Sequence, residues 1–191
     1  MNLSYNTEIA QFWFREGENN YKNKWFESDK GKLYKLDEII TKKFKDKLEL
    51  CESYNENMWH NSEKSIDKNV TTDKINEMID AIICLDQFSR HIYRSIEDKG
   101  KIQNNTKKAA IFSRFLLRFL KDNLTFSELI ELKQEVVIFI LMPLKHEDIY
   151  NNFKLIHNFL EFIYGVAPYF PELITKFYLD SLKKFYTHYK Q

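Results

Sequence analysis

Apolar residues recur along most of this chain in steps of three and four, the spacing of one face of an α-helix. The clearest stripe follows Ser28 and consists of Leu33, Leu36, Ile40, Phe44, Leu48 and Cys51. Helical spacing prevails over the alternation typical of strands, and four Gly and three Pro leave little material for hairpins. The pattern therefore predicts an all-α fold.

Capping residues, prolines and glycines divide the pattern into about seven or more helices. The predicted helices run from Asn6 to Phe14, from Ser28–Asp29 to about Cys51, from Thr72–Asp73 to around Ser89–Ser95, from Asn105–Thr106 to about Lys121, from Thr125 through Met142, from Ile149 to Gly165, and from Pro171 toward Tyr189. Thr125 and Glu128 have the spacing of a capping box, and Pro143 is expected to stop or kink its helix. The polar stretch Glu52–Val70 is expected to be a long loop anchored by Trp59.

Length and composition indicate one soluble globular domain. A chain of 191 residues can bury a sizeable core, so we expect a single all-helical domain over residues 1–191. Hydrophobic residues make up 43% and charged residues 30%, and a net charge of +1 demands neither nucleic acid nor an anionic membrane as partner. The longest apolar run, residues 136–144, is too short to cross a membrane, and no leader-like pattern opens the sequence.

The residues that usually hold metals or phosphates are not grouped in this sequence. Cys51 and Cys84 lie far apart without metal-type spacing, so we expect reduced core thiols in a cytoplasmic protein rather than a bridge. His146–Asp148 are consecutive possible ligands whose side chains would point in different directions. The glycines stand alone and form no phosphate-binding loop. We expect no metal and no cofactor.

A charged motif, Leu85–Arg94, ends an otherwise apolar helix. Asp86 continues the series of isoleucines upstream of it, so its carboxylate is expected to point toward the packed side of the helix. An unpaired buried carboxylate costs several kcal/mol, whereas Arg90 and Arg94, one and two turns on, can donate charge-assisted hydrogen bonds. With Gln87, these residues form the predicted ligand-binding part of the helix.

A second polar group follows Pro143. If the break at this proline brings His146 and Glu147 near Arg90, an imidazole and a carboxylate become available for proton transfer beside a bound anion. His146, Glu147 and Asp86 are then the candidate catalytic residues, and His146 joins the predicted ligand-binding set. The alternative is structural: Asp86 and Arg90 form a buried pair, and His146 caps a helix end. The sequence leaves both interpretations open.

Residues 94–122 carry eight basic side chains against three acidic ones. Four of the basic residues share one helical face, namely Lys107, Arg114, Arg118 and Lys121. Such a stripe can contact nucleic-acid phosphates, but a solvated outer face opposite Phe112 and Leu116 also explains it. We favour the solvated face, and nucleic acid is not expected as a partner.

Several motifs then agree in order with one family. They are Phe12-Trp13-Phe14, Trp25-Phe26, Trp59, the run Leu85–Arg90 with Ile92-Tyr93-Arg94, and Met142–Asp148. Over roughly residues 10–165 the chain resembles the domain-of-unknown-function family 924. The resemblance implies stacked antiparallel helix pairs in a right-handed array similar to tetratricopeptide repeats. It implies no established activity.

The chain departs from this family's pattern in three places. Ser89-Arg90-His91 stands where the family usually has Pro-Arg-Asn, and the family's later acid falls on Asn104 or Asn105. Relatives usually carry a second Arg-Phe-Pro-His-Arg-Asn-like block, whereas residues 185–191 here read Phe-Tyr-Thr-His-Tyr-Lys-Gln. We expect whatever that block contributes to a site to be missing.

Two functions fit the sequence. The first is a cytoplasmic helical-repeat-like binding module that holds a peptide or small anionic ligand through Arg90, Arg94 and His146. The second is a small metal-independent enzyme that acts on an anionic metabolite, with His146 or Glu147 transferring the proton and the arginines stabilising charge. We favour the binding module.

Overall fold

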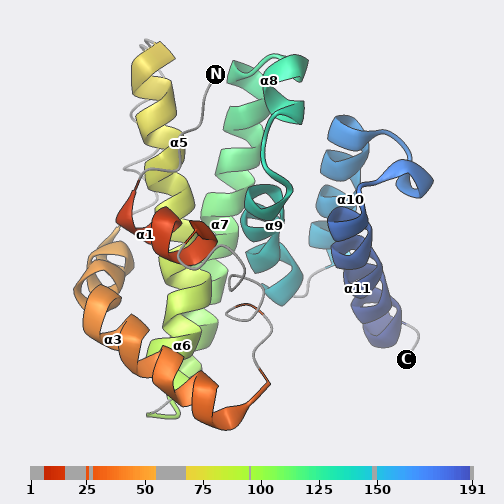
Figure 1. The fold of residues 1–191 in the computed structure, drawn as a ribbon. Coiled ribbons are helices and arrows are strands. Elements are labelled where there is room, and N and C mark those ends of the chain that lie inside the picture. The colour runs from red at the N-terminus through yellow and green to blue at the C-terminus, as the bar shows by residue number, and fades with distance from the viewer. Residues whose placement is uncertain are drawn as a thin grey trace. The chain divides into compact units, whose positions relative to one another are not determined.

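The computed structural model describes residues 7–15, 25, 28–54, 68–94, 96–147 and 150–189. All regular structure in these ranges is helical, as Figure 1 shows, so the all-α prediction is confirmed. The chain forms two compact units, Met1–Phe112 and Ser113–Gln191, and each is described by itself. The single domain over residues 1–191 and the right-handed stacking of helix pairs remain predictions.

The first unit is built from helices near the N-terminus and a long helical rod. Its elements are α1 (Glu8–Ala10), the π-helical η1 (Gln11–Arg15), α3 (Lys30–Ser53), α5 (Lys68–Ile83), the π-helical η2 (Cys84–Phe88), α6 (Ser89–Arg94) and the first part of α7 (Lys99–Asn123). The elements α5, η2 and α6 follow one another without a break and form the yellow-to-green rod of Figure 1. Because α3 packs against both η2 and α6, it covers the end of the rod that carries the charged motif.

The first two predicted helix starts agree with the structure. Thr7 caps α1 by accepting a hydrogen bond from the Ala10 amide at 3.1 Å. Asp29 caps α3 by accepting one from the Lys32 amide at 2.9 Å. The apolar stripe of α3 then turns into the core, where the side chains of Ile40, Phe44, Leu48 and Cys51 are buried.

Aromatic rings fill the centre of the first unit. Phe88 stacks on Phe44 with ring centroids 4.7 Å apart, and Trp13 meets the Phe88 ring edge-on at 5.5 Å. Phe12 contacts Phe44 at 5.0 Å. Such pairs add about 0.5–1.5 kcal/mol each beyond their buried area, so Phe12 and Trp13 stabilise the packing of the N-terminal helix on α3 and the rod.

Two predicted helix starts are wrong. The third helix begins at Lys68 rather than Thr72, because packing of its buried isoleucines outweighs the weak helix propensity of the residues before them. The fourth begins at Lys99 rather than Asn105, because the Asp98 carboxylate accepts a hydrogen bond from the Lys101 amide at 2.9 Å. Both ends of the predicted loop Glu52–Val70 are helical, since α3 reaches Ser53 and α5 starts at Lys68; residues 55–67, with Trp59, lie outside the described residues.

The second unit contains the rest of α7 and the helices after it. They are α8 (Phe126–Ile130), α9 (Gln134–Glu147), α10 (Tyr150–Tyr164), the 3₁₀ turn η3 (Ala167–Tyr169) and α11 (Glu172–Tyr189). The helices α10 and α11 lie antiparallel side by side, and both contact α9 (Figure 1). Eight side chains of α9 are buried, which agrees with its nearly uninterrupted apolar sequence.

The predicted helix from Thr125 through Met142 is two helices. The capping box of Thr125 and Glu128 is present, but it starts only the short α8, and the apolar run belongs to α9. Pro143 was expected to stop or kink its helix, and the stop is wrong because α9 continues to Glu147; the kink remains a prediction. Pro143 is itself buried among neighbouring helices, and this packing offsets the backbone hydrogen bond that proline cannot make.

The predicted end of α10 is confirmed. Gly165 follows Tyr164 with a φ of 78°, the left-handed conformation that suits glycine after a helix.

Within the described part of the chain, no helix has the combination of length and apolar character needed to span a bilayer.

Candidate functional site

The charged motif lies at a change of helix type. The segment Cys84–Phe88 is π-helical, whereas the helices before and after it are α-helical. The Ser89 amide donates to the Cys84 carbonyl, and the Ser89 hydroxyl donates to the Leu85 carbonyl at 2.5 Å. π-Helical turns inside α-helices occur frequently at functional sites, because the extra residue rotates the side chains that follow.

Asp86 is turned inward, as its position in the apolar series predicts. It is 1% exposed, and its Oδ1 accepts hydrogen bonds from Arg90 Nη2 at 3.2 Å and from the Thr106 hydroxyl at 3.4 Å. Its Oδ2 accepts one from Gln87 Nε2 at 2.5 Å. The buried charge is thus held by its own helix and by α7.

Arg90 is held in place by Asp86 and Thr106, but only part of its guanidinium makes hydrogen bonds. Its Nη2 donates to Asp86 and, at 2.9 Å, to the Thr106 hydroxyl. Its Nε is buried without a hydrogen-bond partner among the described residues, and its side chain is 32% exposed. A guanidinium carries five N–H donors, so much of its donor capacity is not used by this network.

Arg94 does not bind Asp86, and this part of the predicted cluster is corrected. Its Nη1 lies 3.1 and 3.3 Å from the two carboxylate oxygens of Asp37 on α3, and its side chain is 41% exposed. The same carboxylate is 2.6 Å from Nδ1 of the buried His91. The reason is geometric, since α3 packs on α6 and supplies a second buried acid closer to Arg94 than Asp86.

Asp37 and His91 were missed as partners of this site by reasoning from sequence. Asp37 lies between Leu33 and Ile40 at helical spacing, so it occupies the core face of its helix just as Asp86 does. The spacing alone could therefore have predicted that the Asp37 side chain faces the core. The pairing of Asp37 with His91 required the packing of two helices that are distant in sequence.

A third, partly buried polar group joins α3 to the end of the rod and to α7. Glu52 Oε1 accepts hydrogen bonds from the Tyr93 hydroxyl at 2.8 Å and from Asn105 Nδ2 at 2.6 Å. Lys108 Nζ donates to the Glu52 carbonyl at 2.5 Å. Burial and the hydrogen bond to Glu52 raise the pKa of the Tyr93 hydroxyl. These contacts explain why Asn105 is inside a helix rather than at its start.

His146 and Glu147 belong to the second unit. Glu147 forms an ion pair with Arg114 and accepts a hydrogen bond from Asn152 Nδ2 at 2.8 Å. Asn152 Nδ2 also lies 3.2 Å from the Leu144 carbonyl, which closes the turn between α9 and α10. Arg114, which was grouped with the basic stripe on α7, therefore contacts Glu147 and Asn152.

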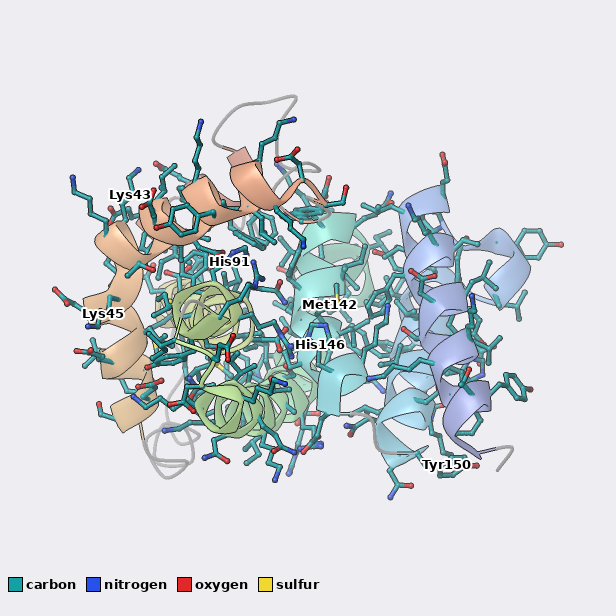
Figure 2. All side chains as sticks on the ribbon, turned by 90° about the horizontal axis from the view of Figure 1, so that it is seen from below. Lys43, Lys45, His91, Met142, His146 and Tyr150 are labelled. Atoms are coloured by element: carbon teal, nitrogen blue, oxygen red, sulfur yellow. The ribbon has the colours of Figure 1, made fainter. Side chains whose placement is uncertain are left out.

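His146 is half-buried in the last turn of α9. Figure 2 shows it one turn after Met142, with Tyr150 at the start of α10. The same view labels His91 on α6 in the first unit, beside α3 with its exposed Lys43 and Lys45. The predicted proximity of His146 and Glu147 to Arg90 concerns both units and remains a prediction.

The described residues contain no cluster of three or more His, Cys, Asp or Glu side chains arranged to hold a metal ion. The charges of the first-unit network come instead as carboxylates matched with arginines, at Asp86 with Arg90 and at Asp37 with Arg94. This arrangement can hold an anion at the partly exposed guanidiniums, because the carboxylates fix them without using all of their donors.

The protein is thus all-helical in its described residues, and buried acids position arginines on a helix that a π-helical turn interrupts. Among protein families, the chain matches the one described as bacterial protein of unknown function (DUF924) over residues 9–167. The chain belongs to this family, as the motifs indicated. Neither the curated proteins nor the solved structures contain a match.

Proposed function

We propose that this protein is a helical binding module that holds a small anion, or the carboxylate of a peptide, at Arg90 and Arg94. The observation that carries the proposal is the state of Arg90. Its position is fixed by Asp86 and Thr106 through Nη2 alone, while its side chain remains 32% exposed.

A purely structural ion pair would favour a different geometry. Arginine and a carboxylate frequently pair through two parallel N–H···O bonds, which uses two nitrogens of the guanidinium. Asp86 is bound through one nitrogen, and its second oxygen goes to Gln87. The pair therefore leaves Arg90 the means to bind a further oxygen.

Arg94 supports the same proposal. It lies four residues after Arg90 on the same helix and is held by Asp37 through Nη1. Two guanidiniums one helical turn apart can grip an anion larger than a single oxygen pair. His146, the concave face of a tetratricopeptide-like stack and the cytoplasmic location remain parts of the proposal taken from the sequence.

The binding module is favoured over the metal-independent enzyme by the contacts of Glu147. Its side chain is largely buried and is engaged by Arg114 and Asn152. Both hydrogen bonds are accepted by Oε2 and hold the carboxylate against α7 and α10, which favours a structural role for Glu147 over proton transfer. Among the proton-transfer candidates His146 keeps that role as a prediction.

The proposal is tested by calorimetric titration of the folded protein with inorganic phosphate, succinate and a short peptide with a free carboxylate. Arg90→Ala is expected to weaken binding of the preferred probe by about 10- to 100-fold, because charge-assisted hydrogen bonds contribute about 1.5–3 kcal/mol. Arg118→Ala is the matched control: Arg118 is exposed and pairs with Asp122 one turn on, so binding should be unchanged.

The variant Asp86→Asn distinguishes a role of the Asp86–Arg90 pair in anion binding from a role in stability alone. The amide oxygen can still accept from Arg90, but the negative charge that competes with an added anion is gone, so the probe should bind more tightly. A structural pair alone predicts that both variants lose stability and that neither changes affinity. An Arg90→Ala variant that keeps both its fold and its ligand would refute the proposed function.

A further inference from the structure

Two cysteines that are distant in sequence meet in the core of the first unit. Cys51 lies in the last turn of α3 and Cys84 is the first residue of η2, and both thiols are free and buried. The helix α3 packs directly on η2, and its contacts with the rod run in antiparallel order, since Asp37 meets His91 and Phe44 stacks on Phe88. Continued toward the end of α3, this order brings Cys51 to the part of the rod where Cys84 lies.

We propose that Cys51 and Cys84 are a redox-active dithiol that forms an intramolecular disulfide when the protein meets a low-molecular-weight disulfide. The inference does not depend on the proposed anion site. It gives a chemical role to two side chains that neither the ion pairs nor the aromatic core of the unit uses.

The oxidation balances with oxidised glutathione as the oxidant. The Cys51 thiolate attacks one glutathione sulfur, forms a mixed disulfide and releases one glutathione thiolate. Cys84, after losing its proton, attacks the Cys51 sulfur and displaces the second glutathione thiolate. The two cysteine protons end on the released thiols, so the protein loses two hydrogens and the glutathione disulfide gains them.

The environment sets the order of attack. Cys51 is 6% exposed and stands one turn from the end of its helix, whereas Cys84 is 0% exposed. Interaction with Cys51 and burial raise the pKa of the Cys84 thiol, which keeps it protonated at neutral pH. Cys51 therefore meets the oxidant first, and Cys84 resolves the mixed disulfide.

The bond would join α3 to the segment that carries the charged motif. Cys84 lies two residues before Asp86, and Cys51 lies next to Glu52, so the link falls between two of the buried polar groups. Closing the chain between residues 51 and 84 removes freedom from the unfolded state. We expect the oxidised protein to melt roughly 10 °C higher than the reduced protein.

The experiment incubates the folded full-length protein with defined ratios of reduced to oxidised glutathione and follows it by intact-mass spectrometry and peptide mapping. The wild type should lose two hydrogens and yield a peptide linked through Cys51 and Cys84. Cys84→Ser should stop with one glutathione on Cys51, and Cys51→Ser should remain unmodified.

Peptide mapping of the wild-type protein shows whether the Cys51–Cys84 disulfide forms, even if a variant fails to fold. The proposal is overturned if the folded protein keeps both thiols at glutathione ratios that oxidise a urea-unfolded sample. It is equally overturned if each cysteine takes up its own glutathione and no linked peptide forms.

Discussion

Asp37 and Asp86 hold two arginines in place from beneath the surface. Each acid is buried, and each arginine keeps part of its guanidinium at the surface. Burying such charges is tolerated because both partners are present, whereas removing one partner leaves an uncompensated buried charge. The arginines are consequently oriented before any ligand arrives, and this lowers the entropic cost of binding.

Removing the charge of Asp37 should cost stability. Asp37→Asn weakens two charge-assisted contacts at once, to His91 and Arg94, and we expect a loss of about 2–3 kcal/mol in urea unfolding. Asp122→Asn is the control, because its pair with Arg118 is exposed and should contribute less than about 1 kcal/mol. Equal effects of the two substitutions would contradict the account.

Asp80 makes the stability of the protein depend on pH. Its Oδ1 accepts a hydrogen bond from the Thr7 hydroxyl at 2.8 Å, and burial raises its pKa from 3.8 to about 6, with Glu77 acting in the same direction and Lys47 against it. The folded state therefore holds a proton that the unfolded state releases. The resulting stability is present below about pH 4 and is lost as the pH rises toward 6.

Asp80→Asn should remove this dependence. The amide can still accept from Thr7 but never becomes a buried charge, so the variant should be more stable than the wild type by roughly 2 kcal/mol at pH 7.5. The difference should vanish near pH 4, where the wild-type carboxyl is protonated. Unfolding curves at the two pH values measure it, and a variant that is less stable at pH 7.5 would show that the charge of Asp80 is favourable.

At the scale of single residues, contacts within one helix could be predicted from helical spacing. The inward turn of Asp86 and its contact with Arg90 could be predicted because both lie on one helix. The pairing of Arg94 with Asp37 could not, because it depends on how α3 crosses α6. Glu147 was predictable as a polar side chain near a helix end, but its partner Arg114 comes from a helix that is distant in sequence.

At the scale of elements, helix ends are set by caps that compete with one another. Asp98 caps α7 seven residues before the predicted cap at Asn105, and the short α8 uses a complete capping box yet ends at Ile130. The apolar periodicity identified the helices themselves correctly. Their boundaries were less predictable, since any Ser, Thr, Asn or Asp near a polar stretch offers a plausible cap.

Two glycines offer a matched test of helix-end geometry. Gly165 has a φ of 78°, so Gly165→Ala should destabilise the protein by about 1 kcal/mol through backbone strain alone, because nothing lies within 4 Å of the added carbon. Gly100 lies in the first turn of α7, where an added Cβ makes only ordinary contact with Asp98. Gly100→Ala should be neutral or stabilise by up to about 1 kcal/mol.

Thermal unfolding of both variants checks this pair. Opposite signs are expected, because alanine is strained after a helix in the left-handed conformation and favoured inside a helix. A Gly165→Ala variant that is as stable as the wild type would mean that α10 does not end as described.

At the scale of the whole molecule, the family region and the charged network coincide. The match over residues 9–167 includes every residue of the Asp37, Glu52 and Asp86 groups, whereas α11 (Glu172–Tyr189) follows it. The all-α class could be predicted from periodicity, but the two compact units could not. Their boundary falls at Phe112–Ser113 inside the continuous α7, and no break in the sequence pattern marks it.

The central claim is that Arg90 is positioned by Asp86 and still available to an anion. It is tested most directly by following the guanidinium N–H resonances of Arg90 in nuclear magnetic resonance spectra while inorganic phosphate or succinate is added at constant ionic strength. The account predicts a saturable shift for Arg90, accompanied by Arg94, that is absent for the control Arg118. A resonance that stays unchanged, or that moves only as Arg118 does, would contradict it.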